Sequence, residues 1–191
     1  MSYKIFTTEN NKLFFVHISG MVNEIENYLI KLNWKTTDKV TNKCFVILDD
    51  PLKRWINATI IDYHAQTFLE NNQLDENPII DYVLKNKIVN NINVKPQIDT
   101  IQKILSQVPI EKITFFKKST NLGYLLNHYL HDNNIKNQFN NSITQSSYYS
   151  EQVEQLTNFI DDEINRHYLN KVLKYLQDDY NFYNSVTFYA R

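Results

Sequence analysis

Glycine and cysteine are scarce in this 191-residue chain, and each shortage excludes a class of protein. Only two glycines occur, Gly20 and Gly123, and the phosphate-binding pattern GxxxxGK[ST] is absent from the sequence, which argues against a P-loop nucleotide hydrolase. The single cysteine, Cys44, cannot form an internal disulfide and fits a reducing compartment, so we expect a cytoplasmic protein. We expect Cys44 itself to be a small core residue rather than a nucleophile.

Excess charge and long apolar runs are also lacking. The formal net charge is -1, so there is no overall basic field, and we expect neither a nucleic acid nor a membrane as partner. We find no signal peptide and no apolar run that could span a bilayer. The chain is 42% hydrophobic and 14% aromatic, which argues against global disorder, and its length favours a single domain over residues 1–191. Abundant Asn, Lys, Ile and Tyr indicate AT-rich coding, as in some phages and low-GC bacteria.

The stretch at 43–60, KCFVILDDPLKRWINATI, predicts a buried strand followed by a tight turn and a helix. Its run CFVIL is β-branched and aromatic enough for a strand that is buried on both faces. Asp50 is placed as an N-cap, and Pro51 fits the first helical position. A helix N-terminus at the carboxyl end of such a strand suits an anion, but Asp49 and Asp50 oppose one.

The same order of strand, turn and helix occurs earlier in the chain. It predicts an α/β fold with a small central parallel sheet and helices on both faces. The expected strands lie at residues 12–18, 44–49 and 112–116, with an edge strand at 3–6 and a polar connection at 35–42. The expected helices lie at residues 21–32, 51–63, 79–89, 99–108, 120–130 and 150–176, the last as one helix or as two joined near Asp161.

Two helix starts carry cap signals of their own. Asp99 and Gln102 have the spacing of a capping box, and Ser119 or Thr120 is placed to cap the helix that follows the last strand. Asp178 and Asp179 lie in a tyrosine-rich ending, and we expect their role to be structural.

Several segments together resemble the sulfotransferases that use the donor PAPS (3′-phosphoadenosine 5′-phosphosulfate), in the carbohydrate and membrane-associated branch. The segment FVHI at 15–18 is similar to the start of that family's FVHIPKxGGTS motif, and DPLKR at 50–54 is similar to the core of its RDPxxRxxS motif. Pro96-Gln97, the segment KITFFKKSTNLGYLL at 112–126 and the ending at 175–186 have counterparts in the same order.

The resemblance implies a P-loop-like three-layer sandwich and sulfuryl transfer from PAPS to a hydroxyl or amine, on a small-molecule or carbohydrate acceptor. It also implies a set of site residues. The donor would be held by Ser19, Gly20, Asn23, Arg54 and Asn57, with His17 beside it. We expect His17 and Glu24 to be the catalytic candidates, with Glu24 or Glu26 as a base for the acceptor hydroxyl, and no metal.

This chain departs from the family pattern where the family places its cations. The family's motif lysine falls on Gly20, and its leading arginine falls on Asp49. An aspartate in place of the arginine would repel a nearby phosphate by about 1 to 4 kcal/mol. Lys31, Lys35 or Lys53 would have to supply the missing charge from elsewhere.

Several candidates also have ordinary structural interpretations. His17 could simply close a buried strand, Arg54 could pair with Asp50 one turn earlier, and Glu24 and Glu26 suit a helix N-terminus without any catalytic role. His128 and His131 would need a third ligand to hold a metal. Lys117 and Lys118 are expected to be solvated.

The sequence therefore leaves two main hypotheses open, beside a weaker one of a different nucleotide- or phosphate-binding enzyme. One is a PAPS-dependent sulfotransferase-like enzyme. The other is a catalytically inactive sulfotransferase-fold protein that acts as a binding module in a homo- or hetero-oligomer, with the tyrosine-rich stretch at 175–189 as its partner surface.

Overall fold

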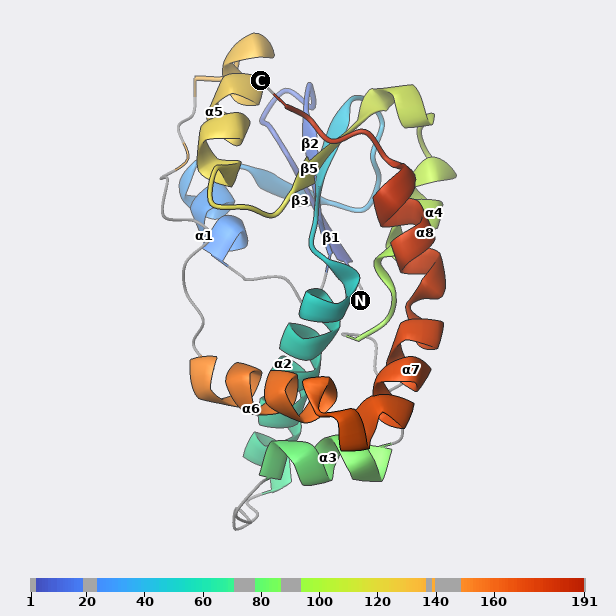
Figure 1. Ribbon diagram of the computed structural model, residues 1–191. Helices are drawn as coiled ribbons and strands as arrows, with labels where there is room; N and C mark the ends of the chain where they lie inside the picture. The colour runs from blue at the N-terminus through green and yellow to red at the C-terminus, as the bar shows by residue number, and fades with distance from the viewer. Residues whose placement is uncertain are drawn as a thin grey trace.

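A five-stranded mixed sheet forms the upper part of the molecule in Figure 1, a computed structural model that describes residues 3–18, 24–70, 78–86, 94–136, 139 and 149–190. The strand order is β3-β1-β2-β4-β5. The strands are β1 (Tyr3–Thr7), β2 (Phe14–Ile18), β3 (Lys35–Thr37), β4 (Cys44–Leu48) and β5 (Ile113–Lys117). β2, β4 and β5 run parallel, with Val16 opposite Val46 and Val46 opposite Phe115, whereas β1 is antiparallel to both of its neighbours.

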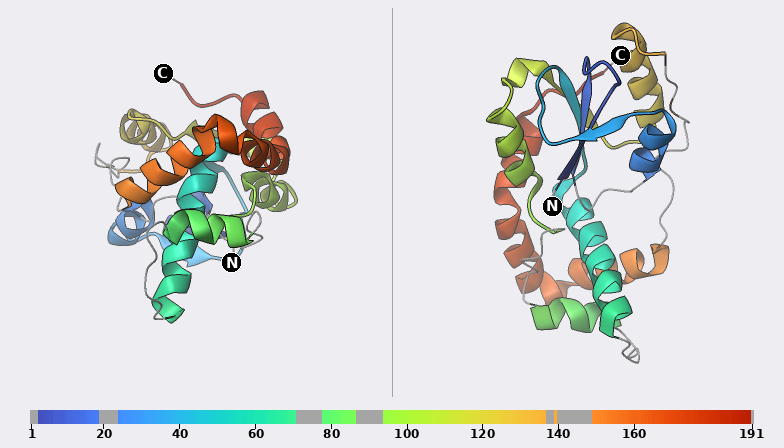
Figure 2. Two further views of the ribbon diagram at one scale, coloured as in Figure 1. Left: turned by 60° about the horizontal axis from the view of Figure 1, so that its bottom comes forward. Right: turned by 180° about the vertical axis from the view of Figure 1, so that it is seen from behind.

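Eight α-helices occur among the described residues. They are α1 (Glu24–Lys31), α2 (Pro51–Glu70), α3 (Pro78–Asn86), α4 (Gln97–Leu105), α5 (Leu122–Asp132), α6 (Ser150–Asp161), α7 (Arg166–Tyr175) and α8 (Gln177–Ser185). Figures 1 and 2 show α1 and α5 on one side of the sheet and α4 and α8 on the other. Helices on both sides explain why every residue of β2 and of β4 is buried.

Two hydrophobic cores hold the chain together. The first surrounds the sheet and includes stacked aromatic rings such as Phe15 and Phe45, whose centroids are 4.9 Å apart. The second lies where α2 extends away from the sheet and packs with α3, α6 and α7 around Trp55. α2 therefore begins at the edge of the sheet and extends into the second hydrophobic core. None of the helices in the described part of the chain is long and apolar enough to cross a membrane.

The predicted α/β class is confirmed, but the sheet is mixed rather than purely parallel. β1 was expected at an edge and lies inside the sheet, because β3 pairs with it on the outer side. The strand β3 falls in the tract at 35–42 that we expected to be a polar connection. Its sequence KTT carries no alternation of apolar and polar residues, so the hydrophobic pattern gives no signal for it.

The C-terminal helical region is broken twice. The break near Asp161 agrees with one of the two predicted arrangements, since Asp162 is extended and its carboxylate accepts the amide N–H of Ile164 at 3.0 Å. A second break at Leu176 separates α7 from α8. In the tyrosine-rich ending, Tyr183 is buried, and Phe182 and Tyr189 pack against the sheet core.

Asparagine occupies the backbone positions with left-handed (positive φ) conformation that glycine usually occupies in other proteins. Asn33 and Asn134 have φ of 59° and 58°, and each follows the end of a helix. Beyond them, the N–H of Trp34 donates to the carbonyl of Leu29, and that of Ile135 donates to Leu130. Both helices therefore end in a Schellman-type motif with asparagine in place of glycine.

Candidate functional site

The carboxyl end of β4 leads straight into α2, as the sequence predicts. The Asp50 carboxylate accepts the amide N–H groups of Leu52 and Lys53, both at 3.1 Å. Asp50 is thus the N-cap, and Pro51 is the first residue of the helix. The free amide groups that could bind an anion at this helix start already have a carboxylate of the chain itself.

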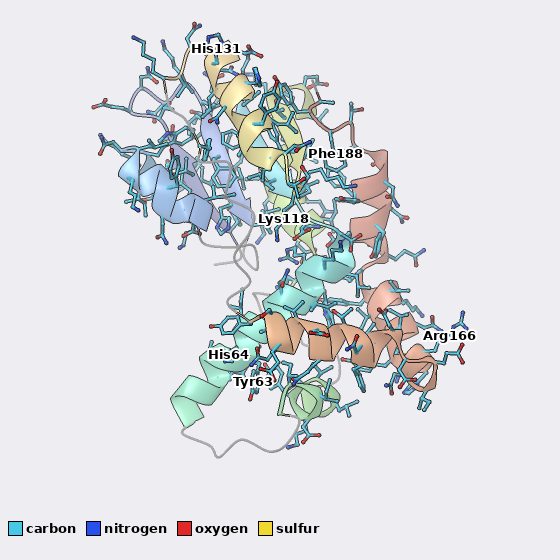
Figure 3. All side chains as sticks on the ribbon, turned by 60° about the vertical axis from the view of Figure 1, so that its left-hand side comes forward. Tyr63, His64, Lys118, His131, Arg166 and Phe188 are labelled. Carbon is cyan, nitrogen blue, oxygen red and sulfur yellow. The ribbon has the colours of Figure 1, made fainter. Side chains whose placement is uncertain are left out.

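Asp49, at the same edge, forms an ion pair with Lys118. Lys118 Nζ lies 2.7 Å from Asp49 Oδ2, and its side chain is 19% exposed. Figure 3 shows Lys118 near the start of α2, where the segment that follows β5 passes. The expectation that Lys118 is solvated is therefore wrong. Lys117 is exposed, as expected, and its Nζ lies 5.5 Å from the centroid of the Tyr183 ring.

Gln97 fixes the backbone of Asp49 from the first turn of α4. Its side-chain oxygen accepts the Asp49 N–H at 3.1 Å, and its side-chain nitrogen donates to the Asp49 carbonyl at 3.0 Å. Gln97 is only 2% exposed. Both backbone groups of Asp49 are thus hydrogen-bonded, as they would be beside a neighbouring strand. The backbone is therefore held for one residue beyond the end of β4.

The start of α4 is capped by a residue from the far end of the chain. Asp179 of α8 accepts the backbone N–H groups of Gln97 at 2.8 Å and Ile98 at 2.6 Å. The predicted capping box of Asp99 and Gln102 is wrong, because the helix begins at Gln97, ahead of both residues. Likewise α5 starts after Asn121 without a side-chain cap, so the caps predicted at Ser119 and Thr120 are not formed.

Arg54 points into this network rather than into solvent. It is 1% exposed, and its Nη1 donates to the Lys95 carbonyl at 2.7 Å. Burial lowers the pKa of the guanidinium, and the charges of Asp179 and Asp49 act in the opposite direction. Burial also raises the pKa of Asp179, against the effects of its two backbone hydrogen bonds and of Arg54. The role expected for Arg54 on a phosphate remains a prediction. In this structure the Arg54 guanidinium donates to the Lys95 carbonyl, and it lies within electrostatic range of Asp179 and Asp49.

A second polar cluster lies at the carboxyl end of β2. Nδ1 of His17 forms a short hydrogen bond with Oε1 of Glu26 in α1, and Lys4 Nζ lies 2.6 Å from the other Glu26 oxygen. His17 is 4% exposed, and Nε2 has no hydrogen-bond partner among the described residues. Although burial opposes this, the hydrogen bonds and charges of His17 and Lys4 lower the pKa of Glu26 overall.

The other predicted site residues are placed only in part. Ser19, Gly20 and Asn23 lie outside the described residues, and so does the side chain of Glu24, the first residue of α1. Asn57 is partly buried on α2, one turn after Arg54. The structure thus brings Arg54 and His17 to the same end of the sheet. It adds Glu26 beside His17, and it adds Lys118, Gln97 and Asp179, whose partners are distant in sequence.

The remaining reactive residue types contribute no site of their own. Cys44 is buried at the start of β4, and burial raises the pKa of its thiol to about 12, so it does not form a thiolate at neutral pH. Within the described ranges, no three His, Cys, Asp or Glu residues are grouped so that they could hold a metal ion.

Comparisons of the chain with protein-family models, with curated proteins and with solved structures find no significant match.

Proposed function

We propose that the chain is a sulfotransferase-like protein with a P-loop-like three-layer sandwich, and that the carboxyl edge of β2, β4 and β5 binds PAPS. PAPS supplies an activated sulfuryl group, and the acceptor is a hydroxyl or amine on a small molecule or carbohydrate. The ordered sequence resemblance supports the family, and the parallel strands β2, β4 and β5, with helices on both sides, support the fold class. Open α/β sheets bind ligands beyond the carboxyl ends of their strands.

The observation that carries this proposal is the position of Lys118. The family places an arginine where this chain has Asp49, and the substitution alone would leave a repulsive charge at the donor site. Lys118 reaches the same carboxylate from the end of β5, 2.7 Å away. The pair is neutral, so it cancels the repulsion expected from Asp49 and leaves a partly exposed ammonium group at the edge.

Lys118 is also better placed than the three lysines considered from the sequence. Lys35 pairs in register with Thr7, which lies opposite Phe14 at the start of β2, so it belongs to the other end of the sheet. Lys31 ends α1 and is exposed there. Lys53 is exposed on the first turn of α2 and remains a second cation near the site.

The test is calorimetric titration of the whole chain with adenosine 3′,5′-bisphosphate at low salt. We expect micromolar binding, and we expect Lys118→Met to weaken it about 5- to 150-fold, the factor for a coupling of roughly 1 to 3 kcal/mol. Lys117→Met is the matched control, because it removes an exposed lysine next in sequence. Arg54→Ala is a poorer probe, since Arg54 is buried and its loss would also disturb folding. Absence of heat at millimolar ligand refutes donor binding.

A second candidate, the inactive sulfotransferase-fold binding module, is favoured by a different feature of the same edge. Arg54, Lys118 and the starts of α2 and α4 all interact with carboxylates or carbonyls of the chain itself. If titration finds no nucleotide, sedimentation of the chain across a concentration range tests this candidate. Self-association supports it, and a monomer that captures no partner contradicts it.

A further inference from the structure

Exposed lysines lie in a row at the end of the sheet that is opposite the proposed donor site. The first residues of β2, β4 and β5 are in register, with Phe14 opposite Cys44 and Cys44 opposite Ile113. A lysine precedes each of these strands, and another begins β3 at the same end, where its partner Thr7 also pairs with Phe14. Because β3 and β5 are the two edge strands, the row crosses the whole sheet. We call it the lysine end, and it consists of Lys12, Lys35, Lys43 and Lys112.

Exposed carboxylates gather at the other end of the molecule, on α6 and on the short helix η2 (Glu163–Asn165) that follows it. Figure 1 shows α6 below the sheet, beyond the start of α2. No lysine or arginine occurs between residues 150 and 165, and Arg166 comes next in the chain. We call this set the acidic end, and it consists of Glu151, Glu154, Asp161, Asp162 and Glu163.

The side chains of both ends are available to a partner. None of the ion pairs within the described ranges includes a member of either set. The formal net charge of -1 conceals the separation, because it sums the two ends of the molecule. A net charge near zero therefore argues against one uniform field, but it is compatible with two local fields of opposite sign.

Each end also carries an exposed isoleucine. Ile164 directly follows Glu163 and is 83% exposed, more than any other large hydrophobic side chain in the part of the chain that the structure describes. Ile110 is 47% exposed and begins η1 (Ile110–Lys112), the short helix that ends with a member of the lysine end. Single exposed isoleucines are common on protein surfaces. An apolar centre with a charged rim on two complementary surfaces is the composition of a protein–protein contact.

Two acids among the lysines favour a protein over a nucleic acid as the partner. Glu9 lies in the turn that leads to Lys12, and Glu111 directly precedes Lys112. A phosphate backbone, which is negative along its whole length, would be repelled by both. A protein surface can carry both signs, and Arg166 beside the acidic end supplies a cation for such a glutamate.

We propose that the lysine end of one copy of the chain binds the acidic end of a second copy. The two surfaces differ and lie at opposite ends of the molecule, so the contact is heterologous, and copies join head to tail into rings or open chains. The inference makes no use of PAPS. It deepens the binding-module candidate, on whose self-association it rests, because it names the surfaces that meet.

The first part of the test is sedimentation of the whole chain across a range of protein concentrations. At low ionic strength we expect the average mass to rise with concentration above that of the monomer. In about 1 M salt, where the Debye length is about 3 Å, we expect the mass to fall towards that of the monomer. A chain that stays monomeric at low ionic strength would overturn the proposal.

The second part reverses the charges of one end at a time. One double variant carries Lys43→Glu and Lys112→Glu, and the other carries Asp161→Lys and Glu163→Lys. In each variant alone, like charges face one another across the contact, so we expect the association constant to fall about tenfold or more. In an equimolar mixture, every contact between the two variants pairs opposite charges again. We therefore expect the mixture to recover the association that each variant lacks.

The control is a third double variant, Lys53→Glu with Lys117→Glu. It makes the same change in net charge as the reversed lysine end, but its exposed lysines lie at the carboxyl edge of the sheet, away from both surfaces. Its association constant should stay within about twofold of the wild-type value. An equal loss in this control would show that net charge governs the association, and it would refute the contact.

The remaining outcomes separate this contact from the proposals on which it borders. If the wild type self-associates and reversal of either end changes nothing, the binding-module candidate stands and this contact is refuted. If the mixture of the two variants stays monomeric, the two ends do not meet and the proposal fails. If the wild type is monomeric but binds a short DNA duplex through the lysine end, the surface serves a nucleic acid and the proposal is wrong. Titration with adenosine 3′,5′-bisphosphate tests the donor proposal separately.

Discussion

Replacing Asp179 should destabilise the fold far more than replacing its exposed neighbour on α8, Asp178. Its carboxylate accepts two backbone N–H groups, at 2.8 and 2.6 Å, and its charge opposes the effect of burial on the pKa of Arg54. Hydrogen bonds to a charged group contribute about 1.5–3 kcal/mol each, and removing one partner of a buried charge pair costs about 3–5 kcal/mol. Because these effects share one side chain they are not additive, so we expect Asp179→Ala to cost about 3–5 kcal/mol.

Asp179→Asn separates hydrogen bonding from charge. The two N–H groups of α4 donate to different oxygens of Asp179, so an asparagine can accept only one of them. It also removes a charge whose burial raises the pKa of this carboxyl. We therefore expect a smaller loss, about 1.5–3 kcal/mol. Asp178 lies next to it in the first turn of α8 and is exposed. Asp178→Ala removes only a surface charge near a helix N-terminus, so the expected cost is below about 1 kcal/mol.

Urea unfolding of the three variants measures these differences as shifts in midpoint at constant slope. The reasoning requires the order Asp179→Ala, then Asp179→Asn, then Asp178→Ala, from most to least destabilised. A cost below about 1 kcal/mol for Asp179→Ala would show that the cap and the charge contribute little. It would also mean that α4 does not depend on α8 for its start.

Four further substitutions test the rest of the network. Gln97→Ala should cost about 2–4 kcal/mol in urea unfolding, because it leaves the Asp49 N–H and carbonyl without partners. Gln102→Ala removes an exposed glutamine of the same helix and is the control. A cost above about 1 kcal/mol for this control would contradict the assignment of the loss to the Asp49 contacts. Asp50→Ala should cost about 0.5–2 kcal/mol through the lost cap of α2, which thermal unfolding will measure. Asp49→Asn should raise the affinity for adenosine 3′,5′-bisphosphate about tenfold in calorimetry by freeing Lys118, and unchanged affinity would place the nucleotide elsewhere. The stability advantage of the wild type over Glu26→Gln should be present above pH 4.5 and should decline as the pH falls below it, since the folded pKa of Glu26 lies under that value.

The local features of the fold were predictable because their causes lie within a few residues. The run CFVIL is buried along its whole length, and Asp50 caps α2 as its position before Pro51 indicates. The same holds for β2 and β5, which are short runs made mostly of apolar residues. In each case the hydrophobic pattern and the turn residues point to the same structure, and the tertiary packing agrees with them.

The features that sequence reasoning missed depend on partners that are far apart in the chain. Asp179 is 82 residues from Gln97, and Lys118 is 69 residues from Asp49. A single sequence gives no signal for such pairs. Asp99 instead matched a local capping pattern, although the helix starts two residues earlier. The sequence offered both Glu24 and Glu26 as candidate bases, and only the placement of α1 against β2 shows that Glu26 contacts His17.

The charges at the sheet edge indicate what kind of anion could bind there. Any ligand near Lys118 competes with the carboxylate of Asp49, which carries one negative charge at 2.7 Å. A monoanion gains no more from the ammonium group than Asp49 already provides, whereas a dianionic phosphate doubles the Coulomb attraction at the same distance. Because Lys118 is partly exposed, salt screens this advantage. If the edge binds an anion as we propose, this argument predicts that it prefers terminal phosphates to carboxylates or sulfate monoesters, most strongly at low ionic strength.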